Sequence, residues 1–106
     1  MYRFKSKAAA DVIYLPDAAN QVLAALGRKA APQGIIEVAD LSAAQQALLA
    51  AVEADEAAFA ALVAEAEAKG EAPPRRQGVT LKQRVWPLLD MLRLSEAQRA
   101  DVIWQG

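Results

Sequence analysis

The sequence has no cysteine and no histidine among its 106 residues. Without cysteine, the chain can form no disulfide and offers no thiolate for nucleophilic attack or for binding a metal. Without histidine, it lacks the usual general base near neutral pH, the commonest metal ligand and the partner of a catalytic serine. We therefore expect no catalytic residues, no metal and no other cofactor, and enzymatic activity is disfavoured without being excluded.

Hydroxyl groups and long apolar runs are also scarce. The four aliphatic hydroxyls belong to Ser6, Ser42, Thr80 and Ser95, and the last three are each followed by Gln three positions later. That spacing is typical of the capping box at a helix start, so capping is favoured over catalysis. The longest apolar run covers residues 57–64, far short of the ~20 residues that a membrane span needs. We expect no membrane segment, and residues 1–16 contain no apolar signal-peptide core, so a cytoplasmic bacterial protein is favoured.

Charge is unevenly distributed, although the net charge is only −1. Residues 1–30 carry a net charge of +3, residues 31–72 carry −7 and residues 73–106 carry +3. The favoured interpretation is that the basic ends fold back on the acidic middle and neutralise it. The alternative is a basic patch made for an external anion.

Residues 41–69 contain neither Gly nor Pro, and half of the residues from 43 to 68 are Ala. Alanine is the strongest helix former, so the sequence predicts one long helix of about 43 Å. Ser42 is the expected N-cap, and Gly70 is the expected residue of positive φ just after the end. The helix has an apolar stripe made of Leu41, Leu48, Val52, Phe59, Leu62, Val63 and Ala66.

Asp55 lies inside this apolar stripe, between Val52 and Phe59. An unpaired carboxylate is very costly to bury. We therefore predict that Asp55 pairs with Arg84 or Arg93 of the following helix. The alternative is that the long helix extends beyond the core at this point and leaves Asp55 in water.

The segments before the long helix are short. Residues 2–5 alternate apolar and basic, and residues 12–15 are an apolar run rich in β-branched and aromatic residues, so both are predicted to be strands. Pro16 opens a helix that Gly27 ends. Residues 35–38 are expected to be a brief extended segment that packs onto the core.

The segments after the long helix begin with a loop at residues 70–78, which is expected to be mobile. A second apolar stripe predicts a helix that starts at Thr80 and is kinked by Pro87. Ser95 is expected to open a last helical turn, and residues 102–104 form a final strand.

A chain of this length suits a single domain covering residues 1–106. Its predicted elements follow the order β-β-α-α-α-β. The sequence therefore predicts the α+β class, in which a small antiparallel three-stranded sheet packs on a layer of helices that includes the long Ala-rich one.

Several segments together resemble a known family. They are Phe4-Lys5-Ser6-Lys7-Ala8, Asp11-Val12-Ile13, Ala31-Pro32-Gln33-Gly34-Ile35-Ile36-Glu37, Leu81-Lys82-Gln83-Arg84, Trp86-Pro87 and Val102-Ile103-Trp104. In this order they resemble the small proteobacterial proteins catalogued as domain of unknown function eighteen-forty. Two positions depart from that pattern, Ala10 where Gly is expected and Tyr14 where Met is expected. The resemblance implies a fold and a bacterial cytoplasmic setting, and it supplies no catalytic residues.

The candidate binding residues are Arg75, Arg76, Lys82, Arg84 and Trp86. On the predicted helix, Trp86 lies about 140° from Leu81 and away from the apolar stripe, and Pro87 beside it costs ~3 kcal/mol in a helix interior. A chain that tolerates both is expected to present the Trp86 ring to a partner or ligand. The alternative is that the sheet covers this side of the helix and that Trp86 belongs to the core.

We expect a small protein that acts by binding, with another protein as its partner, docked near Arg84 and Trp86 or on the acidic helix. A first alternative is binding or processing of a phosphorylated small molecule by carboxylates and Arg. The acidic residues do not show the spacing of metal ligands, so this alternative has no defined set of site residues. A second alternative is weak nucleic-acid binding through residues 75–86. It is disfavoured by a pI near 5.4 and by the absence of a known nucleic-acid motif.

Overall fold

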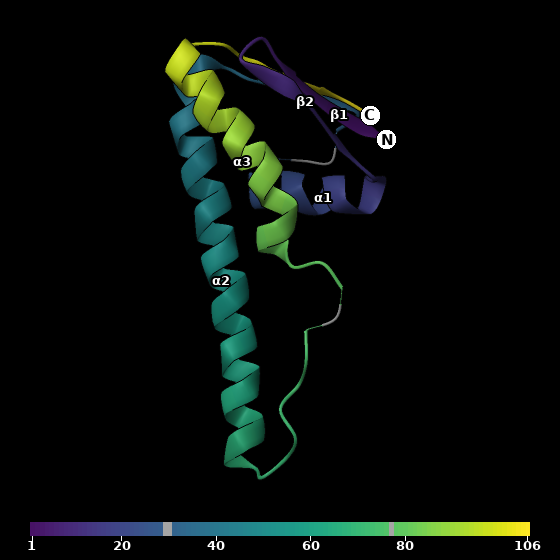
Figure 1. Ribbon diagram of the computed structural model, residues 1–106, viewed down its shortest axis with the longest axis vertical. Coiled ribbons are helices and arrows are strands. Elements are labelled where there is room, and N and C mark those ends of the chain that lie inside the picture. The colour runs from purple at the N-terminus through teal and green to yellow at the C-terminus, as the bar shows by residue number, and fades with distance from the viewer. Residues whose placement is uncertain (29–30, 77) are drawn as a thin grey trace.

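The computed structural model describes residues 1–28, 31–76 and 78–106 (Figure 1). The chain order of the strands and helices is β1 (Tyr2–Ser6), β2 (Ala9–Tyr14), α1 (Pro16–Ala25), β3 (Gln33–Ile36), a 3-10 turn η1 (Val38–Asp40), α2 (Leu41–Ala68), α3 (Leu81–Gln98) and β4 (Val102–Gln105). The predicted α+β class is confirmed. The predicted loop at residues 70–78 includes Gln77, which lies outside the described residues, and its described members form neither helix nor strand.

The sheet has four strands in the order β2-β1-β4-β3, and each neighbouring pair is antiparallel. The prediction of three strands was wrong, because residues 33–36 pair with β4, Gly34 opposite Trp104 and Ile36 opposite Val102. The C-terminal strand β4 is a central strand, with β1 on its other side. A strand of four residues has too little pattern to reveal its partner, so only the tertiary fold assigns it.

All three helices lie on one side of the sheet (Figure 1). The core between the two layers is built from the inward residues of the strands, Phe4, Tyr14, Ile36, Val102 and Trp104, and from Val22, Leu23, Leu41, Leu48, Val85, Leu88, Met91 and Leu92 of the helices. The strand residues in between point outward, and three of them are large and apolar, Ile13, Ile35 and Ile103. The other face of the sheet is therefore open.

Two helices end as their sequences predict. Gly27 and Gly70 have φ angles of 76° and 70°. The amide after each glycine donates back across the last helical turn, Arg28 to the carbonyl of Leu23 at 2.9 Å and Glu71 to that of Ala66 at 2.8 Å. This is the Schellman arrangement, which needs a residue of positive φ and so favours glycine.

Only one of the three predicted capping boxes forms. Thr80 Oγ1 accepts from the Gln83 amide at 3.2 Å, and Gln83 Oε1 accepts from the Thr80 amide at 2.9 Å. Ser42 is not an N-cap, because η1 leads directly into α2 and the helix begins at Leu41 without a side-chain cap. Ser95 does not open a new turn, because α3 continues through it to Gln98.

The long helix α2 extends well beyond the core. Leu41, Ala44 and Leu48 in its first two turns are buried, whereas Leu62 is 55% exposed. Figure 1 shows the lower half of α2 reaching past α1 and α3, accompanied only by the connector between α2 and α3. The molecule consequently measures 52 × 25 × 22 Å. The apolar stripe predicts which side of α2 faces inward, but the length of its neighbours decides how much of that side is covered.

Candidate functional site

Trp86 lies on the outer side of α3 and is 60% exposed. Val85, directly before it, and Leu88, two positions after it, are buried, so the apolar stripe of the helix faces inward and this ring faces outward. The alternative that Trp86 belongs to the core was therefore wrong. A tryptophan ring this exposed is an apolar surface that the rest of the chain does not cover, and binding partners often cover such rings.

Lys82 precedes Trp86 by one turn of α3, and the two residues line a shallow hollow of about 430 Å³ together with Gln83. We call these three residues the Trp86 surface. Among the described residues, no carboxylate lies within ion-pair distance of Lys82, whereas Asp90, one turn beyond Trp86, is paired with Arg93 at 2.5 Å. The Trp86 surface thus combines an exposed aromatic ring with an uncompensated positive charge.

Arg76 does not join the Trp86 surface. Its guanidinium donates a 2.9 Å hydrogen bond to Asp55 Oδ2 and lies over the ring of Phe59, 4.4 Å from its centroid. The predicted partner of Asp55 was wrong, because the carboxylate pairs with this connector arginine and not with Arg84 or Arg93. The alternative that α2 extends beyond the core and leaves Asp55 in water was right only in part. The helix does extend beyond the core, but the Asp55 side chain is paired and only 35% exposed.

Arg84 and Arg75 are also separate from the Trp86 surface. Arg84 is half-buried, and its carbonyl oxygen accepts a hydrogen bond from the hydroxyl of Tyr14 in β2. It is two positions before Trp86, about 200° away around a helix, and so faces another side. Arg75 is exposed in the connector. Of the five candidate residues, the structure brings Lys82 and Trp86 together and distributes the three arginines elsewhere.

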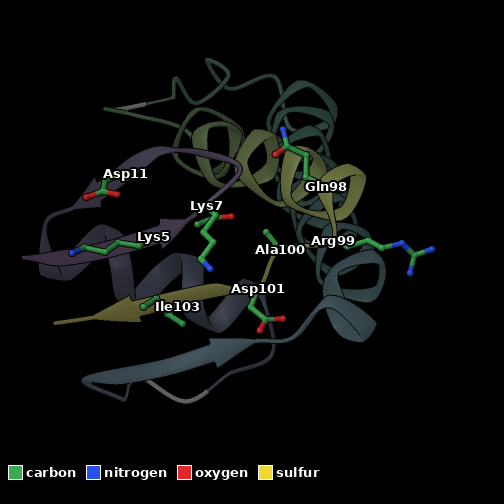
Figure 2. Close-up of a pocket in the computed structure, with 9 residues that line it drawn as sticks. Lys5, Lys7, Asp11, Gln98, Arg99, Ala100, Asp101 and Ile103 are labelled. Atoms are coloured by element: carbon green, nitrogen blue, oxygen red, sulfur yellow. The ribbon is translucent and has the colours of Figure 1, made fainter.

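A second hollow lies on the open side of the sheet, beside the turn between β1 and β2 (Figure 2). It has a volume of about 630 Å³ and is lined by Lys5, Ser6, Lys7, Asp11, Gln98, Arg99, Ala100, Asp101 and Ile103. We call it the hairpin groove. The groove is not evident in the sequence, because its residues come from the two ends of the chain. The available signal was the net charge of +3 on each end.

The described residues offer little for acid–base or metal chemistry. No group of three His, Cys, Asp or Glu in the described part of the chain could hold a metal ion. Burial raises the pKa of the Tyr14 phenol from 10 to about 12, so this buried group stays protonated at neutral pH. Within the described residues, none of the helices combines the length and the apolar character needed to cross a bilayer.

Comparisons with known proteins give a match to a family model and none to an individual protein. No curated protein and no solved structure matches the chain. A family model described as domain of unknown function (DUF1840) matches residues 1–104, nearly the whole chain and every strand and helix of the fold except the last residue of β4. The ordered segments noted in the sequence fall within that match, and the chain therefore belongs to the DUF1840 family.

Proposed function

We propose that this chain is a non-catalytic protein-binding module, and that the Trp86 surface is where its partner docks. The observation that carries the proposal is the 60% exposure of Trp86 beside Lys82, which has no acidic partner among the described residues. Tryptophan contributes disproportionately to protein interfaces, because a large rigid ring loses little entropy when it is covered. A cytoplasmic bacterial setting forms part of the proposal, and the lack of cysteine fits it.

The chemistry of the Trp86 surface favours one kind of partner. An apolar hollow next to a lysine suits a segment that presents an aromatic or aliphatic side chain next to a carboxylate. The carboxylate would pair with Lys82 and replace the water that now solvates it. We therefore commit to an acidic segment of a partner protein as the occupant.

The acidic side of α2 is a weaker docking candidate. Asp55 is neutralised by Arg76 in the connector, and Glu65 pairs with Lys69 at 2.9 Å. Two of its carboxylates thus have partners within the chain already. Nucleic-acid binding through residues 75–86 has less support for a related reason, since Arg76 is bound to α2 and Arg84 faces away from Trp86.

The test compares capture of a partner from bacterial lysate by four immobilised proteins: wild type, Trp86→Ala, Lys82→Gln and Leu62→Ala. Leu62 is 55% exposed on the outer half of α2 and serves as the matched apolar control. A specific partner should be lost with Trp86→Ala, weakened by Lys82→Gln or by added salt, and retained by Leu62→Ala. The captured partner is then fragmented, and the binding fragment should carry an apolar residue flanked by Asp or Glu.

Two results would reject the proposal. One is equal capture by all four proteins, and the other is a binding fragment that is basic. The melting temperature of each variant provides the folding control. Because Trp86 is exposed, its replacement by Ala should change the free energy of unfolding by less than about 0.5 kcal/mol.

A further inference from the structure

We propose that the hairpin groove is a separate binding site for a small molecule that carries a phosphate group. Lys7 is its central cation, Lys5 and Arg99 flank it, and Ile103 supplies an apolar floor. This inference is independent of the Trp86 surface, because none of the residues that line the two hollows is shared. The size of the groove, its charge, the placement of Lys7 and the backbone conformation of Arg99 each support it.

The groove has the size of a small-molecule site. Its volume of about 630 Å³ falls within the range of roughly 300–1,000 Å³ that is typical of ligand pockets. A phosphate group alone would leave most of that space empty. Ile103 is 40% exposed on the outward face of β4, so the uncharged part of a ligand could rest on its side chain.

The groove has an excess of positive charge that its own acids do not neutralise. Asp11 pairs with Arg3 at 3.7 Å, and Asp101 Oδ1 accepts a hydrogen bond from the Val38 amide at 2.9 Å. Within the described residues, no carboxylate lies within ion-pair distance of the three cations Lys5, Lys7 and Arg99. An anion entering the groove would therefore meet positive charges that need not leave another partner.

Hydrogen bonds of the neighbouring residues Ser6 and Ala8 hold the backbone around Lys7. Ser6 Oγ bonds Ser95 Oγ of α3 at 2.7 Å and accepts from the Ala8 amide at 3.2 Å, so one hydroxyl ties the turn to the helix and also bridges the two neighbours of Lys7. Figure 2 shows the Lys7 side chain reaching from the turn toward β4, in the direction of Ile103. In the same view Arg99 extends outward from the opposite side of the groove, where its long side chain can turn toward a ligand.

The backbone of Arg99 adopts a left-handed conformation that favours glycine. Its φ angle is 54°, and among the described residues it alone has a positive φ without being glycine. It ends α3 in the same way that Gly27 and Gly70 end the other helices, with the Ala100 amide donating to the Ser95 carbonyl at 2.9 Å. Because glycine suits this conformation better, the backbone does not account for an arginine here. A role for its guanidinium at the groove would account for the arginine at this position.

The experiment is an NMR titration of the full chain with phenyl phosphate and with inorganic phosphate at low ionic strength. Saturable shifts should be confined to the amides around residues 5–8, 98–101 and 103. Phenyl phosphate should bind more tightly than inorganic phosphate, because only the ester can cover Ile103. Lys7→Gln should weaken phenyl phosphate binding about tenfold, as expected for the loss of one charge-assisted contact. Lys69→Gln, a control of equal charge change just past the end of α2 and outside both hollows, should have no effect.

Arg99→Gly separates the binding role from the helix-ending role. Glycine relieves the left-handed backbone, so this variant should melt no lower than wild type while it binds phenyl phosphate several-fold more weakly. Three results would overturn the proposal: linear shifts spread over all basic residues, equal weakening by Lys7→Gln and Lys69→Gln, or unchanged binding by Arg99→Gly. Equal affinity for the two phosphates would overturn the role of Ile103.

Discussion

The guanidinium of Arg76 is held between the carboxylate of Asp55 and the ring of Phe59, and it fastens the connector to the middle of α2. This contact joins residues 21 positions apart. It gives the stretch of chain between α2 and α3 a defined course beside a helix that would otherwise be uncovered there.

We predict that Arg76→Ala lowers the free energy of unfolding by about 1 kcal/mol. Part of the loss comes from an ion pair that is about a third exposed, and part from the cation–π contact. Arg75→Ala, at the neighbouring exposed position, should be neutral within about 0.5 kcal/mol. A double-mutant cycle with Asp55→Ala should give a coupling energy that shrinks in high salt. Trypsin should also cleave the connector faster in Asp55→Ala. Equal cleavage rates in wild type and variant would show that the pair does not restrain the connector.

Gly34 is packed against a buried ring. A Cβ at this position would lie 2.1 Å from Trp104 Cζ2, and the indole cannot withdraw, because it is 3% exposed and its Nε1 donates to the Ala31 carbonyl. Gly34→Ala should therefore cost about 2–3 kcal/mol in urea unfolding. Gly70→Ala is the control, because a Cβ at that position meets open space. The alanine variant should lose only about 1 kcal/mol of stability, from the strain of a positive φ in a residue with a Cβ. Equal costs for the two variants would contradict the packing argument.

Ser95 is fully buried in α3, and its hydroxyl is bonded to that of Ser6. Ser95→Ala leaves the Ser6 hydroxyl without this partner, so we expect a loss of about 1 kcal/mol in stability. Ser42→Ala should be neutral or slightly stabilising, because Ser42 is exposed, does not cap α2, and Ala is the better helix former. A larger loss for Ser42→Ala than for Ser95→Ala, measured by chemical denaturation, would restore the capping role that the sequence predicted.

Tyr14 should make the protein sensitive to alkali. Burial raises the pKa of its phenol to about 12 in the folded state, whereas in the unfolded chain it ionises near 10. The unfolded state therefore loses its proton first as pH rises, so this contribution to stability is complete below pH 10 and is lost between pH 10 and 12. Tyr14→Phe should flatten the stability profile in that range, at the cost of the hydrogen bond to the Arg84 carbonyl. Identical profiles for the two proteins would show that the pKa of Tyr14 is not raised.

The candidate site was predictable only in part. The angular position of Trp86 on its helix is a local property, because 100° per residue places it away from Leu88 and Val85 whatever surrounds the helix. Whether that side is covered depends on where the sheet and α1 lie. The placement of the basic residues could not be predicted for the same reason. Arg76 and Arg84 are close in sequence, but Arg76 bonds to Asp55 of α2 and the Arg84 carbonyl bonds to Tyr14 of β2. The only sequence signal for the hairpin groove was the net charge of +3 at each end of the chain, because Lys7 and Arg99 line one groove only after β1 pairs with β4.

The sequence by itself determined the helices and most of their ends. The alanine content and apolar period of α2, the glycines after α1 and α2, and the Thr80 capping box act through contacts within about five residues, so they operate before any tertiary structure forms. Tertiary structure alone decided the fourth strand, the partner of Asp55, the burial of Ser95 and the exposure of Trp86. Each of these features depends on contact, or on lack of contact, with residues that are distant in the chain. Which residues make contact follows from how the sheet packs on the helices and from how far that packing covers α2 and α3.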